Sequence, residues 1–130
     1  MHALISQKDG LALSVSSKAG EADRILSVQL QGTQFDAAIV VGNEPVEGCA
    51  PLPDFLRLAA DLSSGTPLQW RSMCLELGFQ VSVSTFAAAP LMLRVFMGST
   101  SDDECDWQVN ASLLLRPVQL REFADALEGA

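Results

Sequence analysis

The sequence predicts an α+β domain in which one antiparallel sheet of about six or seven strands carries two short amphipathic helices on one face. Three observations predict this fold. Apolar residues alternate with polar ones in several short runs, and they recur at helical spacing in two others. The chain also lacks the strand–helix–strand alternation that builds a parallel sheet. The expected order is three strands, a helix, about four strands and a second helix.

The first half of the chain contains three runs with a period of two. They cover residues 11–15, 26–30 and 35–41, and short turn-like links join them. Strands that follow one another through short links pair most simply as an antiparallel meander. Residues 1 to 10 show no clear pattern, and one expectation is that they are poorly ordered.

Two segments carry apolar residues on one helical face, at about residues 53–63 and 117–128. Pro53 suits the first turn of the earlier helix, and Gly65 is a natural stop after it. Pro117 can begin the later helix, which we expect to end at Gly129.

Strand patterns resume at Leu68, and every odd position from Met73 to Val83 is apolar. This parity allows one long strand with a bulge at Gly78, or two strands joined by a tight turn near Glu76 to Gly78. The hairpin is favoured because the single strand would be unusually long. Residues 91–97 are apolar on both faces except at Arg94, residues 107–115 alternate cleanly, and the polar run 98–106 is expected to be a loop.

The composition indicates one folded, acidic domain spanning residues 1–130. Hydrophobic residues make up 48% of the chain, which is too many for a disordered segment. Sixteen acidic residues face eight basic ones, and this balance argues against binding to nucleic acid or to an anionic membrane. A net charge of −8 would attract a basic protein partner, but acidity that only maintains solubility is the favoured explanation.

The chain has an odd number of cysteines, and they lie far apart in sequence: Cys49, Cys74 and Cys105. The chain shows no signal-peptide pattern at its start and no apolar run long enough to span a membrane. These observations predict free thiols in the reducing cytoplasm.

The sequence offers little of the chemistry that catalysis needs. The only histidine is His2, next to the terminus, and there is no tyrosine. The cysteine spacing does not match a zinc site, and the acidic run at 102–106 lacks the register of a calcium loop. No glycine-rich segment matches a phosphate-binding loop. We therefore predict no enzyme activity, no cofactor and no metal site.

Partner contacts are the remaining candidates for function. The densest charge run contains Asp102, Asp103, Glu104 and Asp106, and Trp107 follows it. The run is either a solvated turn or an acidic contact for a basic protein. Tryptophans usually anchor cores but also occur at interface hot spots, so both roles stay open for Trp70 and Trp107.

The segment from Phe86 to Pro90, Phe-Ala-Ala-Ala-Pro, is unusually apolar for a connection between strands. It is either covered by the protein's own helix or exposed as a contact patch. If the segment is exposed as a contact patch, Phe86 and Pro90 would contact the partner, and we include them among the candidate partner-binding residues.

Residues 50 to 128 resemble small bacterial immunity proteins found beside wall-associated and contact-dependent toxins. The resemblance is carried by the segment from Leu56 to Leu62 and three further motifs: Gln69-Trp70-Arg71-Ser72-Met73, Asp106-Trp107 and Pro117-Val118-Gln119-Leu120-Arg121-Glu122-Phe123. In the similar proteins the hairpin at positions 86 to 90 is polar and rich in histidine and glycine. The resemblance implies a protein that neutralises a toxin by binding it, with no catalytic residues.

The sequence therefore predicts a non-enzymatic protein-binding domain, and the resemblance implies an immunity-type neutraliser. Two alternatives remain open. The high apolar share favours a homodimer or a larger self-associating structural or regulatory module. A pocket between the sheet and the helices would instead make it a small-ligand-binding domain.

Overall fold

The computed structural model describes residues 2–6, 11–18, 25–32, 36–42, 50–63, 65–71, 77–85, 89–101 and 104–129. Only the backbone is described at residues 2, 16–18, 25–26, 39–42, 99–101, 104–107 and 128–129. The elements in chain order are β1 (His2–Ile5), β2 (Ala12–Lys18), β3 (Ile25–Gln31), β4 (Asp36–Gly42), α1 (Leu52–Ala60), β5 (Leu68–Arg71), β6 (Leu77–Val83), β7 (Leu91–Ser101), β8 (Glu104–Leu115) and α2 (Pro117–Gly129).

The strands form two antiparallel sheets of four strands each, in the orders β1-β2-β3-β4 and β5-β6-β7-β8. The fold is α+β with antiparallel sheets, but the prediction of one sheet of about six or seven strands is wrong. Alternation shows which residues of a strand face the core, but it does not show which strands share a ladder. The chain passes from β4 to β5 through α1, and the two groups of strands stay separate.

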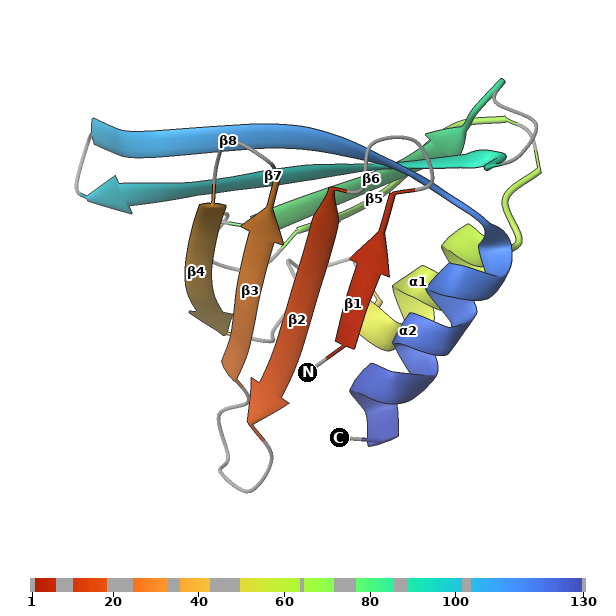
Figure 1. The fold of residues 1–130 in the computed structure, drawn as a ribbon, viewed down its shortest axis with the longest axis horizontal. Coiled ribbons are helices and arrows are strands. Elements are labelled where there is room, and N and C mark those ends of the chain that lie inside the picture. The colour runs from red at the N-terminus through yellow and green to blue at the C-terminus, as the bar shows by residue number, and fades with distance from the viewer. Residues whose placement is uncertain are drawn as a thin grey trace.

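The strands of the first sheet run across those of the second, and the helices lie side by side beyond β1 (Figure 1). The inner faces of both sheets and the apolar faces of both helices form one hydrophobic core. This resembles orthogonal packing of two sheets. Because α2 packs beside β1, at the edge of the first sheet, the expected placement of both helices on one face of a single sheet is also wrong.

The first strand, β1, occupies part of a segment in which the sequence showed no pattern. Leu4 is buried and pairs with Leu13 of β2. The strand has only four residues, so its alternating pattern depends on one buried side chain and is too short to recognise in the sequence. The structure places residues 2–5 in a strand.

Two boundaries in the second sheet differ from those predicted. A hairpin does join β5 to β6, but Gly78 lies within β6, opposite Arg71 and Phe96, so the predicted turn near Glu76 to Gly78 is wrong. The segment 98–106 is not one loop, because β7 continues to Ser101 and β8 begins at Glu104.

Both predicted helices are present. In α2, the backbone N–H of Arg116 donates to Oε1 of Gln119, 2.8 Å away, which satisfies one amide that the helix start leaves free. The helices run antiparallel, since Arg57 reaches Asp125 while Arg121 reaches Asp61. In the described part of the chain, neither helix has the length and apolar character required to cross a membrane.

Candidate protein-binding surface

The face of the second sheet that points away from the core is the strongest candidate for a partner contact. Its side chains alternate with the buried residues of the same strands. We call this surface the outer face, and its residues are Gln69, Arg71, Gly78, Gln80, Ser82, Met92, Arg94, Phe96, Gly98, Gln108, Asn110, Ser112 and Leu114.

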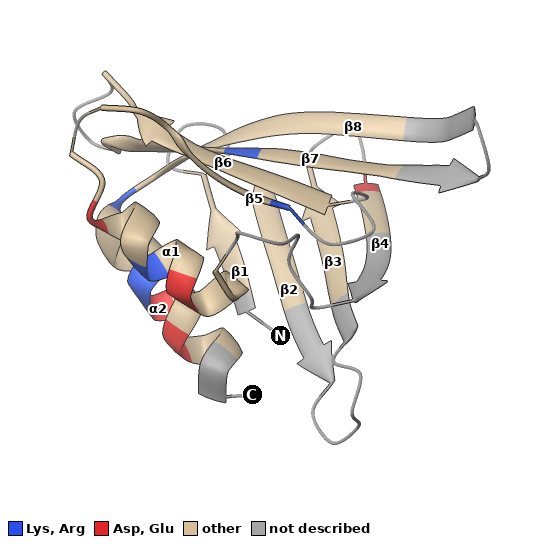
Figure 2. Cartoon of the chain, turned by 180° about the vertical axis from the view of Figure 1, so that it is seen from behind, with Lys and Arg blue, Asp and Glu red and all other residues tan. Residues whose placement is uncertain are grey.

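The outer face differs in charge from the rest of the protein. It carries two arginines and no carboxylate, although the chain has twice as many acidic as basic residues. The described acidic residues lie mostly on the helices and their ends, at Asp54, Asp61, Glu122 and Asp125 (Figure 2). Among the side chains that the structure describes, the outer face is therefore locally positive on an acidic protein.

The two arginines of the outer face have no acidic partner in the described regions, unlike two arginines of the helices. Arg57 lies 2.8 Å from Asp125, and Arg121 lies 2.6 Å from Asp61. Arg71 and Arg94 are exposed and make no ion pair with any residue whose side chain the structure describes. No described carboxylate therefore competes with an external one for these guanidinium groups.

On the outer face, Arg71 of β5 and Phe96 of β7 flank Gly78 of β6. A Cβ atom placed on Gly78 would lie 3.6 Å from Cγ of Arg71 and 3.8 Å from Cβ of Phe96. Gly78 is buried although it faces outward, because these two side chains cover it. The stem of Arg71 and the Cβ of Phe96 thus lie on either side of one glycine.

The apolar part of this face follows β7 and β8. Met92, Phe96 and Leu114 are half-buried, and a hollow of about 250 Å³ lies beside Phe96. The hollow is lined by Arg94, Phe96, Asn110, Ala111 and Ser112. Arginine, phenylalanine and methionine are enriched at protein interfaces, where lysine, aspartate and glutamate are depleted. Two arginines, one phenylalanine and one methionine of the outer face belong to the enriched types.

The structure does not bring the predicted partner-binding residues together in a describable site. Glu104, Asp106 and Trp107 belong to β8, with only their backbone described, and Asp102, Asp103 and Phe86 lie outside the described residues. The register shifts so that Ser99 is opposite Trp107 and Thr100 is opposite Cys105, which leaves Asp106 as the extra residue of a bulge. Their contact role stays a prediction.

The two described residues of the apolar segment 86–90 differ in burial. Ala89 is fully buried, while Pro90 is exposed and its carbonyl accepts a hydrogen bond of 2.7 Å from the N–H of Ser84. Trp70 is fully buried, and its Nε1–H donates to the carbonyl of Ala50, 3.0 Å away. The core role that the sequence left open for Trp70 is confirmed.

The sequence contained one signal for the outer face. Residues 91–97 are apolar on both faces apart from Arg94, and a strand with a fully solvated outer side would not need Met92 and Phe96 there. Nothing in the sequence showed that Arg71 would lie in the same row, because that depends on the register between β5 and β6.

Neither a metal centre nor a relative identifies another site. Among the residues whose side chains are described, no three His, Cys, Asp or Glu residues are grouped closely enough to hold a metal ion. The side chains of His2 and of all three cysteines lie outside that description. The immunity-protein resemblance rests on the quoted residues alone, since no family model, no curated protein and no solved structure matches this chain.

Proposed function

We propose that this chain is a non-enzymatic domain that binds another protein through the outer face of the β5–β8 sheet. One observation carries the proposal: Arg71 and Arg94 lie beside Phe96 on a face where the described side chains include no carboxylate, in a chain of net charge −8. Selection for solubility alone gives no reason to keep acidic residues off one face of an acidic protein.

The chemistry of the face favours an acidic patch on the partner. Arg71 and Arg94 offer planar donor groups that match carboxylates, and Phe96 and Met92, on either side of Arg94 along β7, offer apolar area. Such a contact is governed by local charge complementarity, although the net charge of the whole chain slows the approach of an acidic partner.

A toxin domain is one class of partner within this proposal, supported by the resemblance of residues 50–128 to immunity proteins. The prediction of a basic partner at Asp102, Asp103, Glu104 and Asp106 concerns a different surface. The two contacts are compatible, because a partner with both charges can meet both regions.

Self-association through the outer face is the less favoured alternative. A symmetric dimer joins the same patch on both copies. Two copies of Arg71 and Arg94 would then face one another with no carboxylate among the described side chains of either copy, and like charges in a contact oppose binding. Sedimentation at increasing protein concentration distinguishes the two, since repulsion between the arginines predicts a monomer.

Two substitutions on the outer face test the proposal, each with a matched control elsewhere. Phe96→Ala removes a half-buried apolar side chain from the face, and Leu58→Ala removes an exposed one from α1. Arg94→Glu reverses a charge on the face, and Arg116→Glu makes the same change in net charge at the start of α2.

Proteins captured from a lysate of the source organism by the wild-type chain are identified, purified and titrated against all four variants. We expect Phe96→Ala and Arg94→Glu to weaken binding by about tenfold or more, and the two controls to bind like the wild type. Equal binding by all four variants would place the contact outside this face.

A further inference from the structure

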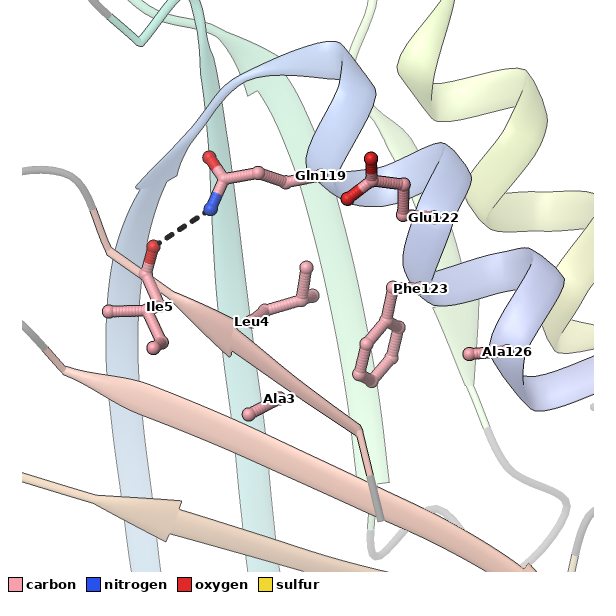
Figure 3. Close-up of a pocket in the computed structure, with 7 residues that line it drawn as sticks. All are labelled: Ala3, Leu4, Ile5, Gln119, Glu122, Phe123 and Ala126. Carbon is pink, nitrogen blue, oxygen red and sulfur yellow. Dashed lines mark hydrogen bonds between the residues drawn. The ribbon is translucent and has the colours of Figure 1, made fainter.

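A second hollow lies at the seam between the edge strand β1 and helix α2. Its volume is about 270 Å³, and it is lined by Ala3, Leu4, Ile5, Gln119, Glu122, Phe123 and Ala126 (Figure 3). The two walls come from opposite ends of the chain. It is separate from the outer face of the second sheet, so a ligand bound here would be independent of a protein bound there.

One wall of the seam is a free sheet edge. β1 is the outermost strand of its sheet, and among the described strands it pairs with β2 alone. The N–H of Ser6 donates to the carbonyl of Leu11 on the β2 side. Because the direction of the backbone groups alternates along a strand, the N–H and C=O groups of Leu4 and His2 also face β2. The N–H and C=O of Ala3 and Ile5 therefore point away from β2, into the seam.

The structure already satisfies one of these groups with a side chain from α2. Nε2 of Gln119 donates to the carbonyl of Ile5 at 3.0 Å. In the described part of the chain, no residue pairs with the outward N–H and C=O of Ala3. One donor and one acceptor on the same residue are the pair that an added antiparallel strand uses.

The rest of the seam offers apolar contact and one negative charge. Leu4 and Phe123 are almost fully buried beneath it, and the side chain of Ile5 is 52% exposed on the β1 side. Glu122 projects from α2, and no described residue forms an ion pair with it. A basic side chain at this position would gain an ionic contact.

We propose that the seam binds an extended peptide segment that carries a basic residue. The segment adds to the edge of β1 through two hydrogen bonds to Ala3, and its apolar side chains pack on Ile5 and Phe123. Its lysine or arginine pairs with Glu122. Main-chain hydrogen bonds supply affinity in this mode of recognition, and the side-chain contacts supply selectivity.

This occupant fits the seam better than a small anion or a helix. A helix satisfies its own backbone groups and would leave the N–H and C=O of Ala3 unpaired. A small anion would meet Glu122 and the carbonyl of Ala3, both of which repel it. An extended cationic chain is complementary to all three features.

The test uses random nine-residue peptides displayed on phage and selected against the full-length protein. Selected peptides are synthesised and their affinities measured by fluorescence anisotropy. We expect enriched sequences to contain lysine or arginine, and Glu122→Gln to weaken their binding by about tenfold. Replacing the basic residue of the peptide with glutamine should weaken binding to the wild type by a similar factor.

Two proline variants of the protein test the backbone contact. Ala3→Pro removes the N–H that faces the seam and leaves the pairing of β1 with β2 intact, because proline is tolerated at the open side of an edge strand. Ala38→Pro makes the same change at the opposite edge of the same sheet, in β4, where the ladder alternation places the N–H of Ala38 outward. We expect only Ala3→Pro to lose binding.

N-methylation of alternate backbone amides in the peptide gives a readout that needs no protein variant. Methylation of the amides facing β1 should abolish binding, while methylation of those facing away should not. A selection that yields no enriched peptide, or peptides that bind Ala3→Pro as well as the wild type, would overturn the proposal. Enriched peptides whose affinity is insensitive to N-methylation would also contradict it.

Discussion

The guanidinium of Arg121 on α2 lies 2.6 Å from the carboxylate of Asp61, the residue that follows α1. Arg57 on α1 makes the reverse contact with Asp125 on α2 at 2.8 Å. The two pairs fix the antiparallel alignment of the helices, but all four side chains are substantially exposed. Exposed ion pairs contribute about 0–1 kcal/mol each, so the apolar faces of the helices must supply most of their mutual stabilisation.

Arg121→Ala is expected to lower the free energy of unfolding by less than about 1 kcal/mol. Phe123→Ala, two residues later on the buried side of α2, should cost about 3–5 kcal/mol because it leaves a cavity in the core. Urea unfolding followed by circular dichroism measures both. A cost for Arg121→Ala that matches the cost for Phe123→Ala would show that the ion pairs, not the core, hold α2 in place.

Trp70→Phe should lower the free energy of unfolding by about 2–3 kcal/mol. The substitution removes the hydrogen bond from Nε1 to Ala50 and leaves a gap where the fully buried ring packs near Phe79, with ring centroids 5.7 Å apart. Chemical unfolding can be followed by the fluorescence of Trp107, the second of the two tryptophans.

The matched control is Gln69→Ala, at the exposed neighbour of Trp70, which should change the stability by no more than about 0.5 kcal/mol. If Trp70→Phe is as mild as Gln69→Ala, the bond to Ala50 and the packing of the larger ring contribute little to the core.

Much of the local structure could be predicted from the sequence, because alternation and helical spacing report which side chains are buried. Leu13, Val28 and Leu113 lie in the core as the period-two pattern indicated. The division into two sheets could not be predicted in this way, since each strand buries the same residues whichever sheet it joins. The short strand around Leu4 had too few residues to show a period.

The candidate surfaces depend on contacts between residues distant in sequence. Arg71 and Phe96 become neighbours only through the register of β5, β6 and β7 across Gly78. Ile5 and Gln119 come together from the two ends of the chain. Sequence patterns within one element do not contain that information, whereas the charged run at 102–106 was visible because its residues are adjacent in sequence.

Gln119 joins α2 to β1, and its two functions can be separated by substitution. Oε1 accepts from the N–H of Arg116 at the helix start, and Nε2 donates to the carbonyl of Ile5. Gln119→Ala removes both contacts and should cost about 1–3 kcal/mol of unfolding free energy. Gln119→Glu keeps an acceptor near the helix start, where a negative charge is favourable, but cannot donate to Ile5 at neutral pH.

We therefore expect Gln119→Glu to recover part of the stability that Gln119→Ala loses. Thermal unfolding of the three proteins at neutral pH gives the comparison, and amide hydrogen exchange shows whether β1 opens more often in both variants. Equal melting temperatures for the wild type and Gln119→Ala would mean that α2 and β1 are held together without this side chain.

Gly78→Ala is expected to keep or slightly raise the stability, by up to about 0.5–1 kcal/mol, because glycine weakens a strand interior relative to alanine. The added Cβ would meet its nearest neighbours, Cγ of Arg71 and the carbonyl oxygen of Trp70, at 3.6 Å, an ordinary contact distance. Gly65→Ala is the control: nothing lies within 4 Å of its Cβ position, but its φ of 98° should make alanine cost about 1–2 kcal/mol. Urea unfolding of both variants separates crowding from backbone strain. A loss of more than about 1 kcal/mol for Gly78→Ala would mean that Arg71 and Phe96 cannot yield to one methyl group, so the row that they form is packed as rigidly as the core.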